Sequence, residues 1–305
     1  MSTNGLVPAF EVGGTHVAAA LVDPARWAPV CARPPRAELD PLGSDVEIIR
    51  NIARCASAIG APAGAVWGAA FPGPFDYEAG IGRFIDVAKF EALRGIDVRR
   101  ALMELIEPRP ADIVFIKDAD AFALGEWRSG AGFGHRRVVG ITLGTGVGSA
   151  FLADGNIVEN ASNVPPEGRV DLLRIEGRAL EDTVSRRAIL AAYSSLSGKS
   201  NPALDVRELS ELARMGNREA RLSIEGAMAS LGRVLAPWLD RFGATLVVVG
   251  GSIAGSWDLI SAPLWSSLSS AVPGLERRLA MVRAQHPDSA AIVGAAIRAC
   301  QKGGR

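Results

Sequence analysis

A glycine-rich phrase occurs twice in this chain, and the repeat constrains the fold more than any other feature. Residues 12–23 read VGGTHVAAALVD and residues 143–154 read LGTGVGSAFLAD. Aligned without a gap, they share Gly13/Gly144, Ala19/Ala150, Leu21/Leu152 and Asp23/Asp154. Each phrase follows an apolar run and ends in a turn residue, which is typical of two antiparallel strands joined by a tight glycine turn. We therefore expect two similar halves, each beginning with a hairpin.

Glycine turns of this kind suit phosphate binding, because they let backbone N–H groups approach an anion closely and at unusual φ. Two such turns indicate a two-lobed clamp around a nucleotide triphosphate. A dinucleotide site would need glycines that open a helix, whereas here the apolar run 149–152 follows. The P-loop pattern also fails, since no Gly-Lys-Ser/Thr follows either turn. Taken singly, either phrase also fits an ordinary hairpin without a ligand.

Bulk composition is that of a globular protein without a strong charge bias. The 305 residues, 48% hydrophobic and 22% charged, suffice for one large or two medium domains. Lys plus Arg equals Asp plus Glu, 33 each, so no net field favours nucleic acid or an anionic membrane. We see no signal peptide and no apolar stretch of the ~20 residues that span a bilayer. Three scattered cysteines fit a reducing cytoplasm, so the expected location is cytoplasmic.

Strand and helix signals alternate along the chain, which predicts an α/β fold with mixed sheets flanked by helices. The clearest expected strands are 65–71, 112–117, 138–141 and 245–249, and the clearest expected helices are 45–59, 97–106, 118–127 and 290–301. The stretch 180–242 is mostly helical in pattern. We expect a small N-terminal lobe, 1–117, on which a final helix, 290–302, packs back, and a large C-terminal lobe, 118–289.

Three polar or glycine positions at strand ends could carry chemistry. Phosphoryl transfer to an alcohol needs a phosphate cradle, magnesium and a carboxylate that takes the hydroxyl proton. Asp118 follows the strand 112–117 and could be that base, or simply a helix N-cap. Glu11 could reach the metal, directly or through water, or face solvent at a sheet edge. Gly250-Gly251-Ser252 could pack against an adenine and present N–H groups, or form a plain strand–helix turn.

The ordered set of phrases resembles the ROK family (repressors, open reading frames and sugar kinases). The phrases are Glu-x-Gly-Gly-Thr from Glu11, Lys-Asp-Ala-Asp from Lys117, Leu-Gly-Thr-Gly-x-Gly from Leu143 and Val-Gly-Gly from Val249. Each is weak alone, but the set is specific and spans nearly the whole chain. The resemblance implies a two-lobed actin/hexokinase-like ATPase fold with a sugar site in the cleft between the lobes. It also implies the use of ATP and Mg²⁺.

The resemblance also assigns expected roles. Phosphates would be cradled by Gly13, Gly14, Thr15, Gly144, Thr145 and Gly146, and adenosine would be flanked by Gly250, Gly251 and Ser252. Asp118 would be the catalytic base, and Glu11 would serve magnesium. The sugar would be contacted by Gly73, Lys89, Lys117, Asp118, Arg169, Asp171 and Glu181.

Departures from the family pattern concentrate in the expected sugar site. The family's Gly-Glu-x-Gly-His phrase is replaced by PPEGRVD at 165–171, and no Cys or His occurs between residues 136 and 285. A structural zinc site needs about four such ligands, so we expect no zinc. Asp171 stands where the family has His, Arg169 where it has Glu, and Lys89 and Lys117 each where it has Asn.

These replacements bear on which sugar would bind. Carboxylates from Asp171 and Glu181 beside the ring would favour an ammonium group. Lys89 and Lys117 argue the other way, although Lys117 could instead hold Asp118 ionised. The alternatives of a neutral hexose and an amino sugar therefore stay open.

The expected function is that of an ATP-dependent hexose kinase, acting on the 6-hydroxyl of glucose or of an amino-hexose such as kanosamine. The main alternative is a catalytically inactive sugar sensor of the same family without a DNA-binding domain, since few residues precede the first strand. A carboxylate or acyl kinase of the same superfold is a further possibility at the level of fold. The expected partner is a small sugar, and the family resemblance implies a homodimer.

Overall fold

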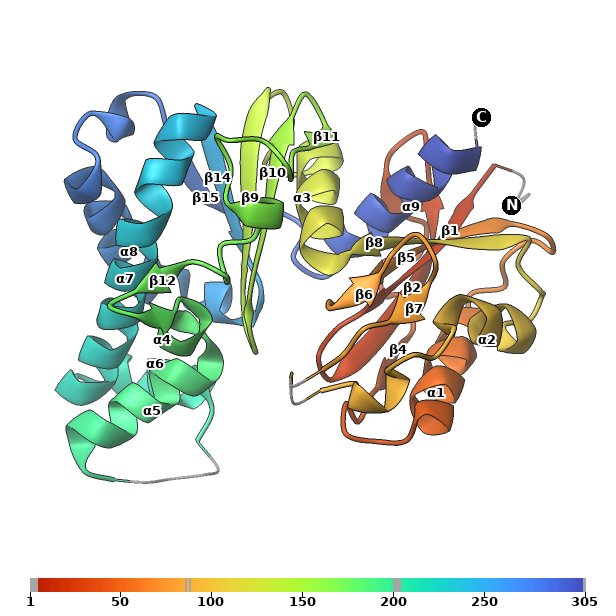
Figure 1. The fold of residues 1–305 in the computed structure, drawn as a ribbon, viewed down its shortest axis with the longest axis horizontal. Coiled ribbons are helices and arrows are strands. Elements are labelled where there is room, and N and C mark those ends of the chain that lie inside the picture. Colours follow the sequence, from red (N-terminus) through yellow and green to blue (C-terminus); the bar gives the residue numbers. More distant parts are fainter. Residues whose placement is uncertain (1–4, 86, 88, 200–203, 304–305) are drawn as a thin grey trace. The chain divides into compact units, whose positions relative to one another are not determined.

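The computed structural model describes residues 5–85, 87, 89–199 and 204–303, and it divides the chain into two compact units. Unit 1 comprises Met1–Gly130 and Asp288–Arg305, and unit 2 comprises Ala131–Pro287. Each unit contains one principal β-sheet with helices packed on it, as Figure 1 shows. The expected α/β class is confirmed. No helix among the described residues is both long and apolar enough to cross a membrane.

The sheet of unit 1 begins with the predicted hairpin and continues with parallel strands. Its strands follow the order β3-β2-β1-β5-β8, and β4 pairs with β2. They are β1 (Val7–Val12), β2 (His16–Asp23), β3 (Ala28–Pro29), β4 (Arg36–Glu38), β5 (Val66–Phe71) and β8 (Asp112–Lys117). The β1–β2 pair is antiparallel, whereas β1–β5 and β5–β8 are parallel.

The sheet of unit 2 repeats this plan in the order β11-β10-β9-β14-β15. Its strands are β9 (Arg137–Leu143), β10 (Val147–Ala153), β11 (Asn156–Ile157), β14 (Leu246–Gly250) and β15 (Ala280–Arg283). The two hairpins differ by one residue. Val12 pairs with Val17 across the first turn, whereas Leu143 pairs with Val147 across the second. The sequence repeat therefore marks a repeated sheet, but its gapless alignment shifts by one position after the turn.

Helices cover both sheets, joined by short secondary elements. Unit 1 contains α1 (Asp45–Ser57), α2 (Val98–Leu105), α3 (Asp118–Ser129), α9 (Ala290–Gly303), β6 (Phe75–Asp76), β7 (Ile81–Gly82) and η1 (Glu91–Leu93). Unit 2 contains α4 (Glu181–Val184), α5 (Arg186–Ser197), α6 (Val206–Arg214), α7 (Arg218–Phe242), α8 (Trp257–Ala271), β12 (Arg174–Ile175), β13 (Arg178–Ala179), η2 (Pro166–Gly168), η3 (Ser252–Ser256) and η4 (Leu275–Arg277).

Glycines allow α9 to approach its neighbours in unit 1 at backbone contact. A Cβ at Gly294 would lie 1.8 Å from the carbonyl oxygen of Ala121 in α3, and one at Gly125 would lie 1.9 Å from that of Ala290. On β5, a Cβ at Gly68 would lie 2.0 Å from the carbonyl oxygen of Ala295. Any side chain at these positions would push the elements apart, so the close packing depends on glycine.

The division into units differs from the expected lobe boundary. The sequence predicts that the first lobe ends at residue 117, whereas α3 lies wholly in unit 1 and unit 2 begins at Ala131. The physical reason is the packing just described, because α3 and α9 make extensive contacts with each other. A strand-to-helix junction at Asp118 marks a change of element, and it carries no information about which sheet the helix will pack with.

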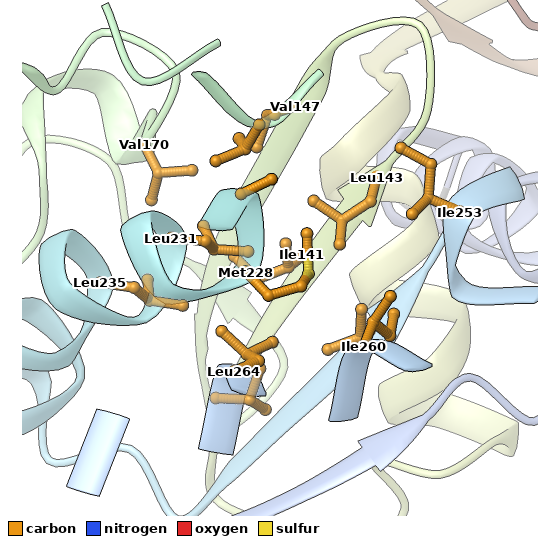
Figure 2. Close-up of a cluster of buried hydrophobic side chains, with 14 of the residues drawn as sticks. Ile141, Leu143, Val147, Val170, Met228, Leu231, Leu235, Ile253, Ile260 and Leu264 are labelled. Carbon is orange, nitrogen blue, oxygen red and sulfur yellow. The ribbon is translucent and has the colours of Figure 1, made fainter. Parts of the chain in front are cut away.

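Unit 2 has a continuous hydrophobic core under its sheet. Side chains from β9 and β10 meet those of α7 and α8, as Figure 2 shows for Ile141, Leu231 and Leu264. All three side chains are fully buried. This core fixes the strand ends from which the turns of the candidate site project.

Candidate functional site

Three strand ends of unit 1 meet at one edge of its sheet. Glu11 on β1 pairs with Ala70 on β5, and Phe71 pairs with Lys117 on β8. Because these strands are parallel, the residues that follow them lie at the same edge, as in other open α/β sheets. Glu11, Gly73 and Asp118 are thereby placed along this edge. Lys89, which is predicted for the sugar site, acts electrostatically on Asp118.

Asp118 is the first residue of α3, after Lys117 at the N-cap position. Its Oδ1 accepts a hydrogen bond from the N–H of Ala119 at 2.8 Å. The N-cap role considered in the sequence analysis is therefore taken by Lys117, which forms no side-chain cap bond. Burial raises the pKa of the Asp118 carboxyl, whereas the Lys89 charge, the Ala119 N–H and, less strongly, the Lys117 charge lower it. A half-buried carboxylate with a raised pKa in such a position suits a general base.

Lys117 forms an ion pair with Asp120, a residue to which the sequence assigns no role. Its Nζ lies 3.0 Å from Oδ1 of Asp120, and the two side chains are 16% and 4% exposed. The Lys117 charge still favours the ionised form of Asp118, as expected, but the Lys89 charge has the larger effect on that carboxyl. Opposite charges three residues apart at a helix start face one another, and that spacing could have revealed the pair.

The first glycine turn is exposed and contains a histidine. Thr15 at the tip is exposed, and Gly13 and Gly14 are half-buried. Nε2 of His16 lies 3.5 Å from Oε1 of Glu11, and a Cβ at Gly13 would lie 2.7 Å from Cε1 of the same ring. Gly13 therefore makes room for His16.

Unusual backbone angles do not explain the glycines of either turn. None of Gly13, Gly14, Gly144 and Gly146 has a positive φ. The expectation that these turns exploit glycine's unusual φ is wrong for them. Where the structure requires glycine in these turns, the reason is that a Cβ would collide with a neighbouring side chain. The open space beside the backbone also suits close approach of an anion.

The second glycine turn lies beside the Gly250–Ser252 phrase in unit 2. The Gly144 N–H donates to the Gly146 carbonyl at 3.0 Å, and Gly250 pairs with Thr142 at the end of β9. Gly251 has a φ of 84°, and a Cβ there would lie 2.3 Å from the Leu143 carbonyl oxygen. Two phrases that are about a hundred residues apart in the sequence are thus adjacent, as a shared phosphate and nucleoside site requires.

Further contacts complete this edge of unit 2. A Cβ at Gly144 would lie 3.4 Å from Oγ of Ser252, and one at Gly146 would lie 3.0 Å from Oε2 of Glu181 in α4. Thr145 at the tip is exposed. Glu181, which the resemblance assigns to the sugar, therefore lies next to the second glycine turn.

Arg169 and Asp171 form an ion pair in the loop 165–171. The Nη2–Oδ2 distance is 2.6 Å and the Nε–Oδ1 distance is 3.3 Å, so the pair is bidentate. The hydrogen bonds to Asp171 raise the pKa of Arg169. Asp171 is 15% exposed, and its charge is compensated by the guanidinium. Asp171 therefore already has a cationic partner, so its carboxylate gives no reason to expect selection of an ammonium group.

The carboxylates of the described residues do not form a metal site by themselves. They are better suited to magnesium that is bound to a nucleotide. Within the described ranges, no group of three or more His, Cys, Asp or Glu side chains is arranged to hold a metal ion. Magnesium in phosphotransferases takes one or two carboxylates and completes its shell with phosphates and water. Glu11, beside the first glycine turn, has the donor chemistry for that role.

The repeated sheets, each opening with a glycine-turn hairpin, are those of the actin/hexokinase-like ATPase fold. A family model described as "ROK family" matches residues 7–302. The chain therefore belongs to the ROK family, and the resemblance noted in the sequence is confirmed.

Named relatives of this chain include kinases for different sugars. The chain is 28% identical to a glucokinase of Thermotoga maritima over 247 residues, 74% of this chain and 76% of that protein. It is 26% identical to an N-acetyl-D-glucosamine kinase of Haemophilus influenzae over 239 residues, 69% and 74% of the two chains. The crystal structure of a ROK family glucokinase from Streptomyces griseus with glucose and AMPPNP superposes with a TM-score of 0.76 at 24% identity, covering 97% of this chain and 100% of that one. The last likeness supports the fold.

Proposed function

We propose that this protein is an ATP-dependent hexose kinase that phosphorylates the 6-hydroxyl of glucose or of a related hexose. The observation that carries the proposal is the placement of Asp118, which lies half-buried at the first position of α3, directly after β8. The Lys89 charge acts on this carboxylate. The kinase relatives support the reaction class.

Each candidate residue has a specific task in this proposal. Oδ of Asp118 accepts the proton of the sugar hydroxyl as the oxygen attacks phosphorus. The glycine turns at 13–15 and 144–146 border the phosphate oxygens, and Gly250–Ser252 borders the nucleoside. ATP with magnesium supplies the phosphoryl group and neutralises charge on the β- and γ-phosphates. Glu11 is the carboxylate that serves this magnesium.

The Arg169–Asp171 pair favours a neutral hexose over an amino-hexose such as kanosamine. A bidentate guanidinium already uses the Asp171 carboxylate, and displacing it would cost two charge-assisted hydrogen bonds. The positive charge of Lys89 adds repulsion for an ammonium group near Asp118. We therefore expect glucose or another uncharged hexose to be the better substrate.

The proposal is tested by measuring ADP formation with a panel of sugars. Glucose, mannose, their N-acetylamino derivatives, glucosamine and kanosamine should be compared with the wild-type protein and with Asp118→Asn. Loss of a general base lowers turnover by about 10²–10⁴-fold, with ATP affinity retained. Asp97→Asn is a matched control, because Asp97 is the N-cap of α2 and accepts from the Arg100 N–H at 2.9 Å.

The outcomes separate a kinase from an inactive sensor. ADP formation with at least one hexose, lost in Asp118→Asn and kept in Asp97→Asn, supports the kinase. Hexose binding measured by calorimetry without ADP formation would instead support a sugar sensor. The altered residues Lys89, Arg169 and Asp171 are the reason to keep that second reading in the experiment.

A further inference from the structure

A buried hydroxyl in β10 forms hydrogen bonds to the backbone on both sides of Arg169. Ser149 is 1% exposed. Its Oγ donates to the carbonyl oxygen of Gly168 at 2.7 Å and accepts from the N–H of Val170 at 2.9 Å. The hydroxyl thus uses its donor and one of its acceptor sites on the two residues that flank Arg169.

Ser149 occupies a position where the strand pattern calls for an apolar side chain. Side chains alternate along a strand, so Val147, Ser149 and Phe151 share the face of β10 that packs into the hydrophobic core of unit 2. Figure 2 shows Val147 and Val170 among the side chains of that core. A hydroxyl on this face is costly unless it is hydrogen-bonded, and both bonds that justify it go to the loop 165–171.

The loop that receives these bonds has an unfavourable conformation of its own. Glu167 has a φ of 57° and Gly168 one of 64°. A left-handed conformation at a residue other than glycine persists when the surrounding structure holds it. Beyond the local turn bonds to Pro165 and Pro166, the Ser149 hydroxyl ties the loop to the sheet on both sides of Arg169.

We propose that Ser149 is a positioning residue for substrate binding. Its hydroxyl fixes the main chain at Gly168 and Val170, and this orients the Arg169–Asp171 pair that the sugar meets. The inference rests on the proposed hexose kinase function for its substrate. β10 also begins directly after the phosphate turn 144–146, so one strand holds the turn at its start and the sugar loop through its third residue.

Ser149→Ala tests the proposal, with hydrogen exchange and kinetics as separate readouts. The variant should accelerate amide exchange in peptides covering residues 165–173 by about tenfold or more, since each tenfold corresponds to one hydrogen bond of ordinary net strength. The KM for the hexose should rise by a similar factor, and the KM for ATP should stay within about twofold. Ser149→Thr, which keeps the hydroxyl, should restore both properties.

A buried serine elsewhere in unit 2 provides the matched control. Ser223 is 3% exposed, and its hydroxyl donates to the Ala220 carbonyl within α7 at 2.8 Å. Ser223→Ala should leave exchange in 165–173 and the hexose KM unchanged. Equal effects of the two alanine variants would show a merely structural role and overturn the proposal.

The remaining outcomes are also decisive. Unchanged loop exchange in Ser149→Ala overturns the proposal whether or not the protein is a kinase. Faster exchange with an unchanged hexose KM overturns the link to substrate. If the wild-type protein neither binds nor phosphorylates any sugar of the panel, the proposed function fails, and with it the link to the sugar. The exchange rates of the loop 165–173 still decide whether Ser149 holds that loop.

Discussion

The Lys117 ammonium pairs with the Asp120 carboxylate across the first turn of α3, at an Nζ–Oδ1 distance of 3.0 Å. Asp118, the candidate base, lies between these two residues in the sequence. Two charges that sit largely out of water cost little only while they face each other. Lys117 therefore pairs with a carboxylate in the first turn of α3. Lys89 is the predicted sugar-site lysine with the larger effect on the pKa of Asp118.

Breaking this pair should destabilise unit 1 strongly. Lys117→Met removes the ammonium that faces the buried Asp120 carboxylate, and we expect a loss of about 3 kcal/mol or more in the free energy of unfolding. The double variant Lys117→Met/Asp120→Asn removes both charges and should recover most of that loss, with Asp120→Asn as the second single variant. Urea unfolding of the single and double variants measures the coupling. A single variant as stable as the wild type would show that the pair is unimportant.

Asp118→Asn should stabilise the protein while it removes activity. Burial raises the pKa of Asp118 in the folded state, so folding favours the protonated carboxyl. That contribution is present below the unfolded pKa and is lost as the pH rises through the folded pKa. The asparagine oxygen can still accept from the Ala119 N–H. We therefore expect the variant to melt above the wild type near neutral pH, with the difference shrinking as the pH falls; an equal or lower melting temperature at neutral pH would contradict this.

Lys89→Met should shift the pH profile of catalysis. The Lys89 charge lowers the pKa of Asp118 against the effect of burial, so its removal lets that pKa rise further. The acidic limb of kcat/KM, which reports the free enzyme, should then move to higher pH. Lys199→Met is a suitable control, since Lys199 is an exposed lysine of unit 2. A limb at the wild-type pH would show that Lys89 does not set the ionisation of the base.

Arg169→Met should change which sugar is preferred. Without the guanidinium, the Asp171 carboxylate loses its bidentate partner and becomes available to an ammonium group. The ratio of kcat/KM for kanosamine to that for glucose should rise by about tenfold, given ~1.5–3 kcal/mol for a hydrogen bond to a charged group. The double variant Arg169→Met/Asp171→Asn should return the ratio to the wild-type value. An unchanged ratio in the single variant would remove Asp171 from the sugar site.

Gly146→Ala should weaken nucleotide binding. The new Cβ would lie 3.0 Å from Oε2 of Glu181, so the carboxylate or the turn must move, and we expect the KM for ATP to rise by about tenfold. Gly226→Ala is the control, because no atom lies within 4 Å of a Cβ at that position in α7 and alanine favours the helix. Similar ATP kinetics in both variants would argue against the phosphate role of the turn.

Much of the fold could be predicted because the sequence states it locally. The two glycine phrases specify hairpins through alternating apolar residues and turn chemistry, and these patterns depend on neighbours a few residues away. The strand 112–117 was predicted at the bounds it has in the structure. Asp118 and Gly250–Ser252 could be singled out because they follow such strands directly.

The tertiary structure decided which of these features meet. The sequence cannot show that Gly251 packs on the Leu143 carbonyl, or that α3 belongs with α9, since both contacts join residues more than a hundred positions apart. It also left the charges of Lys117 and Asp171 unassigned, because a charge's effect depends on which opposite charge lies within a few ångströms. The sequence by itself determined the repeated hairpins, the candidate base and the family. Only the folded chain decided that Lys117 pairs with Asp120, that Arg169 pairs with Asp171 and that Ser149 binds the loop 165–171, because these contacts depend on side-chain placement that local patterns do not encode.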